Sequence, residues 1–325
     1  MRAIVVDRPG PDCSLRLGEA PNPQPGPGQV LIKVTAAGVN RADLLQARGQ
    51  YPPPPGASDL LGLEVSGVIE QVASQSDTAW RVGDQVCALL PGGGYGEYAV
   101  AEAAHLLPRP ANLPLPDAAA LPEAACTVWS NLLEGGFTPA STLLVHGGAG
   151  GIGTMAVALA AAMGATVYAT AGAPERVAAV ERLGAARGID YKQADFAQVV
   201  MEATGGRGVD VILDVVGAKY LEPNLACLAV GGHLMVIGLM GGAKAEVNLA
   251  KMLARRQTLA VTNLRNRTAA DKAAIVDQVH RDVWPLVESG RLPLAIGTRM
   301  PMVEAAQAHE LMRRGQVTGK ILLTW

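Results

Sequence analysis

The sequence predicts an α/β protein in which a doubly wound parallel sheet follows a β-rich first segment, and a last segment of two helices and one strand returns to that first region. Three observations predict it. Helical and strand patterns alternate through the middle of the chain, which is typical of a parallel sheet with crossover helices. The first 120 residues show strand alternation and many Pro and Gly residues. A cluster of glycines follows the apolar run 142–145 and precedes the helix-prone stretch 154–163.

The first 120 residues contain several short strands and one short helix. Alternating apolar residues predict strands at 3–6, 30–35, 62–70 and 85–90. The Pro- and Gly-rich segment 9–28 is expected to be an irregular loop or an edge. A short helix is expected from Leu44 to Arg48, ending at Gly49 before the rigid run of four prolines, 52–55, which presents Tyr51 from a stiff support.

The glycine cluster Gly148–Gly153 matches the spacing G-x-G-x-x-G. In a strand–turn–helix setting such glycines allow a sharp turn, a close approach of the backbone to a pyrophosphate, and tight packing of helix on strand. The N-terminus of the following helix offers N–H groups to phosphate. A glycine-rich loop that only turns the chain is the alternative, but the flanking strand and helix favour dinucleotide binding.

The end of the next strand, 166–170, favours NADPH over NADH. An NAD site commonly has an acidic residue there, whereas this chain has Thr170, Ala171 and Gly172. Arg176 follows in the first turn of the next helix and could pair with a 2′-phosphate. The neighbouring Glu175 argues against this, and Arg176 as an ordinary solvated charge stays open.

The remainder of the chain continues the alternation and then returns to the first region. Helices are expected at 117–133, 174–183, 196–203, 220–229, 268–288 and 303–313, and strands at 209–215, 233–237, 258–261 and 319–324. We expect domain boundaries that give segments 1–120, 121–264 and 265–325.

The composition excludes several classes of protein. The net charge is −2 over 325 residues, and the basic residues form no stripe for nucleic acid or for a membrane surface. The start of the chain lacks the apolar length of a signal peptide, and no run is long enough to span a membrane. We therefore expect a cytoplasmic protein. The four cysteines lack C-x-x-C spacing and are expected to be free thiols.

Motifs along nearly the full length carry a resemblance to a known superfamily. They are AAGVN at 36–40, GQYPPPPGA at 49–57, LGLEVSG at 61–67, VGD at 82–84, ALPE at 120–123, the stretch 145–153, and GLMGG at 238–242. The chain resembles the zinc-free quinone oxidoreductase branch of the medium-chain dehydrogenase/reductases, most closely the tumour-suppressor-inducible NADPH-dependent type. The resemblance implies a GroES-like catalytic domain with an inserted Rossmann domain that binds NADPH.

Two positions distinguish this chain from the zinc-dependent relatives. Asn40 stands where those relatives have a metal-binding cysteine, and Leu63 replaces the histidine of a Gly-His-Glu motif. A leucine side chain cannot ligate a metal, so no metal site is expected. Without a Lewis acid an unactivated carbonyl is a poor hydride acceptor, whereas quinones and α,β-unsaturated carbonyls delocalise the incoming charge themselves.

The resemblance also implies roles for individual residues. Asn40 and Tyr51 would hydrogen-bond the acceptor oxygens, although Asn40 as a helix cap and Tyr51 as a packing residue are equally open. Glu64 and Asp43 are expected to be structural acids. Cofactor contacts are implied for Thr127, Ala149, Gly150, Gly151, Ile152, Gly153, Gly172, Arg176, Tyr191, Gly238, Leu239, Met240, Leu264, Arg265, Asn266 and Lys320.

The expected function is therefore NADPH-dependent, metal-free reduction of a quinone. A reductase of enones or 2-alkenals, and an NADPH-binding sensor or scaffold without turnover, are the alternatives. A small molecule is the expected partner, with no nucleic acid and no membrane. The strand expected at 258–261 also predicts a homodimer formed by edge pairing between Rossmann domains.

Overall fold

The computed structural model describes residues 1–10, 12–74 and 78–325, which form two compact units. Unit 1 comprises residues 1–126, 264–290 and 295–325, and unit 2 comprises 127–263 and 291–294. The sequence-based boundaries after residues 120 and 264 lie close to these. In chain order, unit 2 is therefore an insertion in unit 1.

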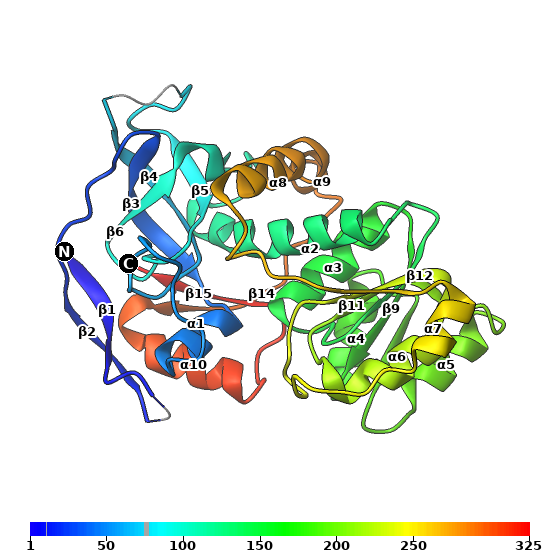
Figure 1. Ribbon diagram of the computed structural model, residues 1–325. Coiled ribbons are helices and arrows are strands. Elements are labelled where there is room, and N and C mark those ends of the chain that lie inside the picture. The colour runs from blue at the N-terminus through cyan, green and yellow to red at the C-terminus, as the bar shows by residue number, and fades with distance from the viewer. Residues whose placement is uncertain (11, 75–77) are drawn as a thin grey trace. The chain divides into compact units, whose positions relative to one another are not determined.

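Unit 1 is built on a mostly antiparallel seven-stranded sheet (Figure 1). Its order is β14-β15-β3-β4-β5-β7, and β6 also pairs with β3. The C-terminal strand β15 lies antiparallel to β3, so the last segment of the chain completes a sheet that the first segment began. The strands are β3 (Gln29–Gly38), β4 (Glu64–Val72), β5 (Gln85–Leu89), β6 (Tyr98–Glu102), β7 (Leu106–Pro108), β14 (Ile296–Pro301) and β15 (Lys320–Thr324).

The segment expected to be irregular, 9–28, contains part of a hairpin. The strand β2 (Ser14–Glu19) pairs with β1 (Arg2–Asp7) in a two-stranded antiparallel sheet. Residue 11 lies outside the described residues. Ser14 and Arg16 are exposed whereas Leu15 packs against the core. Of the two expectations for this segment, a loop or an edge, the structure confirms an edge strand at Ser14–Glu19.

The helices of unit 1 are α1 (Arg41–Ala47), α8 (Ala269–Asp282), α9 (Trp284–Glu288) and α10 (Ala305–Arg313), with 3-10 turns at Ala103–His105, Leu115–Ala120 and Met302–Glu304. The prediction of one long helix over 268–288 was wrong. Two helices occupy that stretch because Pro285 lacks the N–H that would continue the helix and crowds the preceding turn. Trp284 starts the second helix and is 2% exposed.

Unit 2 contains the doubly wound parallel sheet that the sequence predicts. Its six strands lie in the order β10-β9-β8-β11-β12-β13, and each neighbouring pair is parallel. Helices α2 and α3 lie on one side of the sheet and α5 and α6 on the other (Figure 1). The strands are β8 (Thr142–Val145), β9 (Thr166–Ala171), β10 (Arg187–Asp190), β11 (Val209–Asp214), β12 (Leu228–Val236) and β13 (Thr258–Val261).

The helices connected with this sheet are α2 (Pro122–Glu134), α3 (Gly151–Ala162), α4 (Pro174–Arg182), α5 (Phe196–Ala203), α6 (Leu221–Cys227) and α7 (Leu249–Arg255), with a 3-10 turn at Ala218–Tyr220. The helix expected to continue to residue 229 ends at Cys227, and β12 begins at Leu228. Leu228 is fully buried and packs in the core of unit 2 as part of that strand. Burial in the sheet therefore overrides its helical propensity.

The strand order places the glycine turn at the centre of the sheet. β8 lies between β9, which follows it in the chain, and β11. The strand order reverses at β8, because β9 and β10 lie on one side of it and β11, β12 and β13 on the other. In such sheets ligands bind outside the carboxyl ends of the strands at the reversal. The turn 146–150 directly follows β8 and leads into α3.

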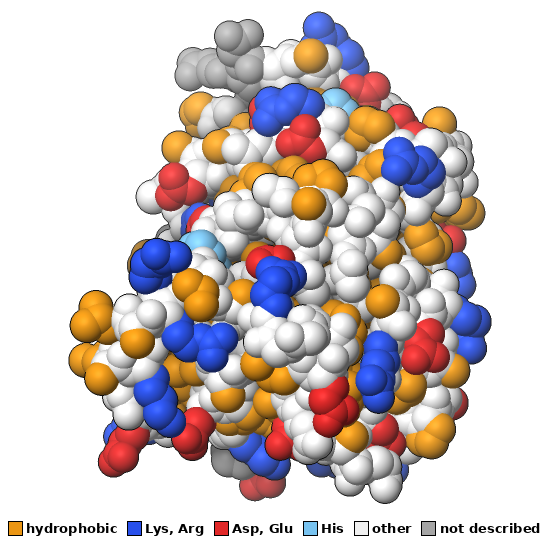
Figure 2. Space-filling view, turned by 90° about the vertical axis from the view of Figure 1, so that its right-hand side faces the viewer, with side chains coloured by type: hydrophobic (Ala, Val, Ile, Leu, Met, Phe, Trp, Pro, Cys, Tyr) orange, Lys and Arg blue, Asp and Glu red, His pale blue; other side chains and the backbone are white. Residues whose placement is uncertain are grey.

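Acidic and basic side chains are interspersed on the face shown in Figure 2, and neither sign forms a continuous stripe there. This agrees with the small net charge of the sequence. Among the described residues, no helix has both the length and the apolar character needed to cross a membrane.

Candidate functional site

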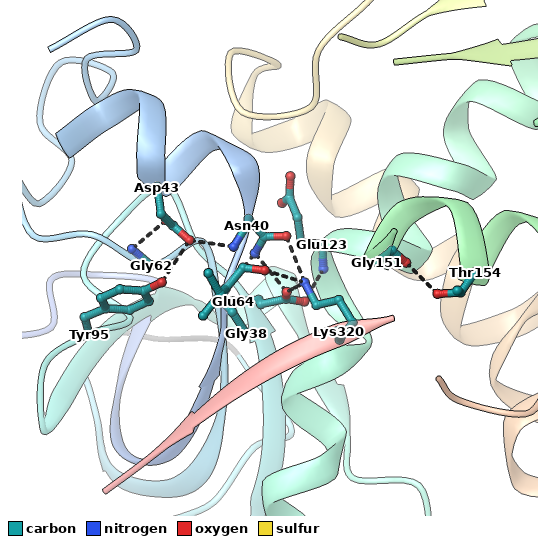
Figure 3. Close-up of polar contacts among 11 residues, drawn as sticks. Gly38, Asn40, Asp43, Gly62, Glu64, Tyr95, Glu123, Gly151, Thr154 and Lys320 are labelled. Atoms are coloured by element: carbon teal, nitrogen blue, oxygen red, sulfur yellow. Dashed lines mark hydrogen bonds and ion pairs between the residues drawn. The ribbon is translucent and has the colours of Figure 1, made fainter. Parts of the chain in front are cut away.

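A buried ionic cluster lies in unit 1 where β4, β15 and the start of α1 meet (Figure 3). The ammonium of Lys320 pairs with Oε1 of Glu64 and donates to Oδ1 of Asn40 at 2.8 Å and to the carbonyl of Val39 at 3.3 Å. Glu64 is fully buried and Lys320 is 4% exposed. Three donors thus meet three acceptors, as a buried ammonium requires. The expectation that Glu64 is a buried, paired structural acid is confirmed.

The Asn40 side-chain amide is held by hydrogen bonds within the protein. Its Nδ2 donates to Glu64 Oε1 at 2.9 Å and to the Gly38 carbonyl at 3.3 Å, and its Oδ1 accepts from Lys320. Both amide hydrogens are therefore used within the protein. Asn40 is also the N-cap residue of α1, but its amide points to the ionic cluster. These bonds place Asn40 and Lys320 in the ionic cluster, and the substrate and cofactor contacts that the resemblance implies for them stay predictions.

Asp43 organises the chain around α1. Its carboxylate accepts from the backbone N–H of Asn40 at 2.7 Å and of Gly62 at 3.0 Å, and from the Tyr95 hydroxyl at 3.2 Å. The Tyr95 hydroxyl in turn contacts Nε2 of His309 at 3.1 Å. Burial raises the pKa of Asp43 to about 6, although these hydrogen bonds oppose the shift. The stabilising role expected for Asp43 is confirmed.

Tyr51 is half-buried, and its hydroxyl is the more available of the two polar groups expected to meet the acceptor. Arg265 holds the Tyr51 loop. Its guanidinium lies 5.2 Å from the centre of the Tyr51 ring and donates to the Tyr51 carbonyl at 3.2 Å. The described residues supply no hydrogen-bond partner for the Tyr51 hydroxyl, so this group can serve a ligand. Burial raises the pKa of Tyr51, which keeps the hydroxyl protonated as a donor.

Arg265 itself has few donors left for a cofactor. It is 4% exposed and also donates to the Pro91 carbonyl at 2.7 and 2.9 Å and to Oε1 of Gln46 at 2.7 Å. These contacts join three segments of unit 1 that are far apart in sequence. We therefore interpret the Arg265 side chain as a structural clamp for the Tyr51 loop.

The residues at the zinc-branch positions do not fit a metal ion. Leu63 is 1% exposed and packs as a core side chain, and the Asn40 amide is engaged as described. The described part of the chain contains no group of three or more His, Cys, Asp or Glu side chains placed to hold a metal. The donor set itself, an amide and an aliphatic group, lacks the ligands that zinc requires.

The glycine turn of unit 2 has the close packing that its spacing predicts. A Cβ added to Gly153 would lie 2.2 Å from the Gly147 carbonyl oxygen and 2.6 Å from the Gly148 Cα. Gly150 is the N-cap of α3, and the Gly148 N–H donates to the Thr170 carbonyl at 2.8 Å. The first turn of α3 leaves its N–H groups without intrahelical acceptors. These residues therefore fit a bound pyrophosphate.

The region expected to hold the adenosine phosphate lies at the ends of β9 and β10. A Cβ at Gly172 would lie 2.6 Å from the Tyr191 hydroxyl, so the tyrosine lies directly over this glycine. Arg176 is half-buried in the first turn of α4. No carboxylate of the described chain pairs with its guanidinium. A free guanidinium beside small residues fits a phosphate, which favours the phosphate role over an ordinary structural charge.

The loops after β11 and β12 are fixed to one another at the same edge of the sheet. Asp214 accepts from the backbone N–H of Val216 at 2.6 Å and of Gly217 at 3.0 Å. The Met240 N–H donates to the Val215 carbonyl at 3.2 Å. Leu239 and Met240 are 52% and 62% exposed. Because these two apolar side chains are exposed and do not pack in a core, they are available for the nicotinamide contact that the resemblance implies.

A polar network that the sequence did not indicate connects these strand ends. Nδ1 of His146 contacts the Thr170 hydroxyl at 3.1 Å, and Nε2 contacts Oδ1 of Asn224 at 2.7 Å. Asn224 then donates to Asp214 at 3.2 Å. Because the amide of Asn224 donates to Asp214, its oxygen must accept from His146. The network holds the carboxyl ends of β8, β9 and β11 together, and only the fold reveals it.

The other expected cofactor contacts are divided between the two units. Thr127 and Gly238 belong to unit 2, whereas Leu264 belongs to unit 1. The exposed fraction is 9% for Thr127 and 5% for Leu264. Asn266 is exposed. Nothing in either unit by itself tests these contacts, and they stay predictions.

Comparison with known proteins agrees with the fold and the motifs. Residues 26–111 match the alcohol dehydrogenase GroES-like domain, and residues 151–279 match the zinc-binding dehydrogenase domain. A 2-haloacrylate reductase of a Burkholderia species is 32% identical, with 99% of this chain and 98% of that protein covered. The chain belongs to the medium-chain dehydrogenase/reductase superfamily.

The solved structures similar to this chain include two NADPH complexes that cover all of it. A mycobacterial protein complexed with NADPH is 31% identical with a TM-score of 0.90 and is fully covered. An Escherichia coli quinone oxidoreductase complexed with NADPH is 27% identical with a TM-score of 0.86 and 99% covered. The resemblance to quinone oxidoreductases is therefore confirmed at the level of the superfamily and its quinone oxidoreductase-like members.

Some superfamily relatives are far longer than this chain. The phthioceranic/hydroxyphthioceranic acid synthase of Mycobacterium tuberculosis is 34% identical over 98% of this chain, which spans 15% of that protein. A chain of this type thus also occurs as one part of a large synthase.

Proposed function

We propose that this chain is an NADPH-dependent reductase that transfers hydride, without a metal, to an electron-poor acceptor of the quinone class. NADPH supplies the hydride when bound. The glycine turn 148–153 and the start of α3 hold the pyrophosphate, Gly172, Arg176 and Tyr191 surround the 2′-phosphate, and Leu239 and Met240 border the nicotinamide. The NADPH complexes of the two similar structures support this cofactor.

The observation that carries the proposal is the ionic cluster of Lys320, Glu64 and Asn40. Its member Asn40 stands where the zinc branch has a metal-binding cysteine, and the Asn40 amide is already paired with Glu64 and Lys320. The protein must therefore act on acceptors that take up charge by conjugation. The Tyr51 hydroxyl, on its proline-supported loop, orients the acceptor oxygen as a hydrogen-bond donor.

A specific observation favours a second acceptor class. The 2-haloacrylate reductase matches over 98% of its length. An enone, 2-alkenal or 2-haloacrylate would take hydride at carbon by the same residues. An acceptor assay decides between this class and quinones.

The experiment measures NADPH oxidation by the purified protein with a series of quinones, 2-alkenals and 2-haloacrylates. Higher kcat/KM for the quinones supports the proposal, and higher kcat/KM for the alkenes supports the second class. NADPH binding without turnover of any acceptor would overturn both and favour a sensor or scaffold. Turnover of simple alcohols with stoichiometric zinc would overturn the metal-free mechanism.

We also propose a homodimer that pairs the β13 edges of two unit 2 sheets. β13 is the last strand in the sheet order, and Val261 on it is 68% exposed. Leu249 and Leu253 on the nearby α7 are 73% and 81% exposed. An open strand edge beside exposed apolar side chains is a common site of subunit association.

A further inference from the structure

Glu123 is a carboxyl group to which neither the motifs nor the cofactor contacts give a role. It lies in the first turn of α2, where its backbone N–H donates to Oε2 of Glu64 at 2.9 Å. Figure 3 shows its side chain turned away from the Glu64–Lys320 pair. The side chain is half-buried, and the described residues offer its carboxyl oxygens no hydrogen-bond partner. A half-buried acid without a partner is unusual and needs an explanation.

The surroundings of Glu123 favour the protonated acid. Burial, followed by the negative charge of Glu64, raises the pKa of Glu123 to about 8, and Asp43 adds to the rise. Lys320 on β15 and Lys272 on α8 oppose it, as does the positive end of α2. At neutral pH most of the population therefore carries the proton, and the group is a donor with a pKa suited to general acid catalysis.

Glu123 also shares its electrostatic neighbourhood with the residues expected to meet the acceptor. Its charge raises the pKa of Tyr51 and acts on Arg265, the clamp of the Tyr51 loop. The charge of Glu123 also acts on Lys272, where it opposes the fall in pKa that burial causes. All four residues belong to unit 1. The Tyr51 hydroxyl and the Glu123 acid are thus two unpaired donors in one region of the catalytic unit.

We propose that Glu123 is the proton donor of the reduction. The inference rests on the proposed function. Hydride addition leaves a negative charge on the acceptor. The O–H bond of Glu123 then breaks, and its proton forms an O–H bond on the reduced quinone, or a C–H bond on the carbon next to the carbonyl of a reduced enone. The acceptor has gained two electrons and two hydrogens, and water reprotonates the Glu123 carboxylate.

Steady-state kinetics of Glu123→Gln tests the donor role, because glutamine keeps the shape but has no acidic proton. In the wild type, kcat should fall as the pH rises through about 8. The variant should lose this limb and show kcat lower by about 100-fold or more. Glu288→Gln, an exposed change in the same unit, is the matched control and should behave as the wild type. A Glu123→Gln variant with wild-type kcat and an unchanged high-pH limb would overturn the donor role.

A second measurement needs no acceptor. Infrared difference spectra between the wild type and Glu123→Gln should show a carboxylic acid C=O band that disappears with a midpoint near pH 8. Its absence at neutral pH would overturn the proposal even if the variant is slow. An inactive wild type overturns the proposed function and with it the donor role. An active wild type together with a Glu123→Gln variant of wild-type kcat overturns only the donor role.

Discussion

Replacing Lys320 with methionine removes one partner of a buried ion pair and should strongly destabilise unit 1. Glu64 is fully buried, and the Lys320 side chain is 5% exposed. In the variant, the Glu64 carboxylate keeps only the Asn40 amide and the Glu123 N–H as partners. Leaving a buried charge without its counter-ion costs about 3–5 kcal/mol of unfolding free energy. Methionine fills similar volume, so little of the loss comes from a cavity.

Thermal and urea unfolding measure this loss. Trp284 and Trp325 lie in unit 1 and report on its unfolding by fluorescence. A loss of about 3–5 kcal/mol corresponds to a fall in Tm of roughly 6–20 °C for a unit of this size. Lys33→Met, an exposed change on β3, is the control and should stay within about 0.5 kcal/mol of the wild type.

A double variant separates the charge from packing. Adding Glu64→Gln to Lys320→Met removes the unpaired charge, so we expect the double variant to regain at least about 1.5 kcal/mol relative to Lys320→Met. If Lys320→Met unfolds within about 1 kcal/mol of the wild type, or if Glu64→Gln restores nothing, the argument that a desolvated charge pair holds this cluster together is refuted.

Three further changes and one pH series test the rest of the structure. Gly153→Ala should abolish NADPH binding in a fluorescence titration and lower Tm, because its Cβ would meet the rigid backbone of the turn; an unaffected Kd would contradict the phosphate turn. Arg176→Ala should raise KM for NADPH about 10-fold or more and leave KM for NADH nearly unchanged, and equal effects on both would reject the phosphate role. Burial lowers the pKa of His146 to about 4, below its ordinary value of about 6.5. The stability that neutral His146 contributes is therefore fully present above pH 6.5 and is lost as the pH falls toward 4. Thermal unfolding between pH 7 and 4 measures this loss, and a loss of Tm in His146→Gln equal to that of the wild type would refute the argument. Val261→Lys should convert a dimer to monomers in sedimentation velocity, and a monomeric wild type would remove the proposed dimer.

Several features of this protein could be predicted from local sequence because local physics decides them. The glycine spacing of 148–153 specifies a tight turn whatever surrounds it, and most strands and helices of unit 2 follow from short-range periodicity. Helix α7 (Leu249–Arg255) was not predicted. Helix α5 was expected over the very residues it occupies. The break at Pro285 was missed, although the proline itself is a local signal, since the apolar period continues across it.

The site in unit 1 was only partly predictable. The resemblance indicated Asn40, Tyr51 and Lys320 as relevant positions, and the ligand contacts that it implies stay predictions. It did not indicate that Asn40 and Lys320 are joined to each other and to Glu64. Lys320 and Asn40 are separated by 280 positions, and no periodicity reports a pairing at that range. Glu123 belonged to a recognised motif, yet its burial and its lack of a partner become visible only in the folded chain.

The sequence by itself determined the dinucleotide turn and most strands and helices of the parallel sheet, because these depend on residue type and short spacing. The resemblance to the zinc-free branch added the loss of metal-binding side chains at positions 40 and 63. Only the tertiary structure decided which polar groups are satisfied and which are left for a ligand or a proton. That distinction depends on desolvation and on partners from distant segments. One such partner is Lys320, which β15 brings to Glu64 only when this strand pairs with β3.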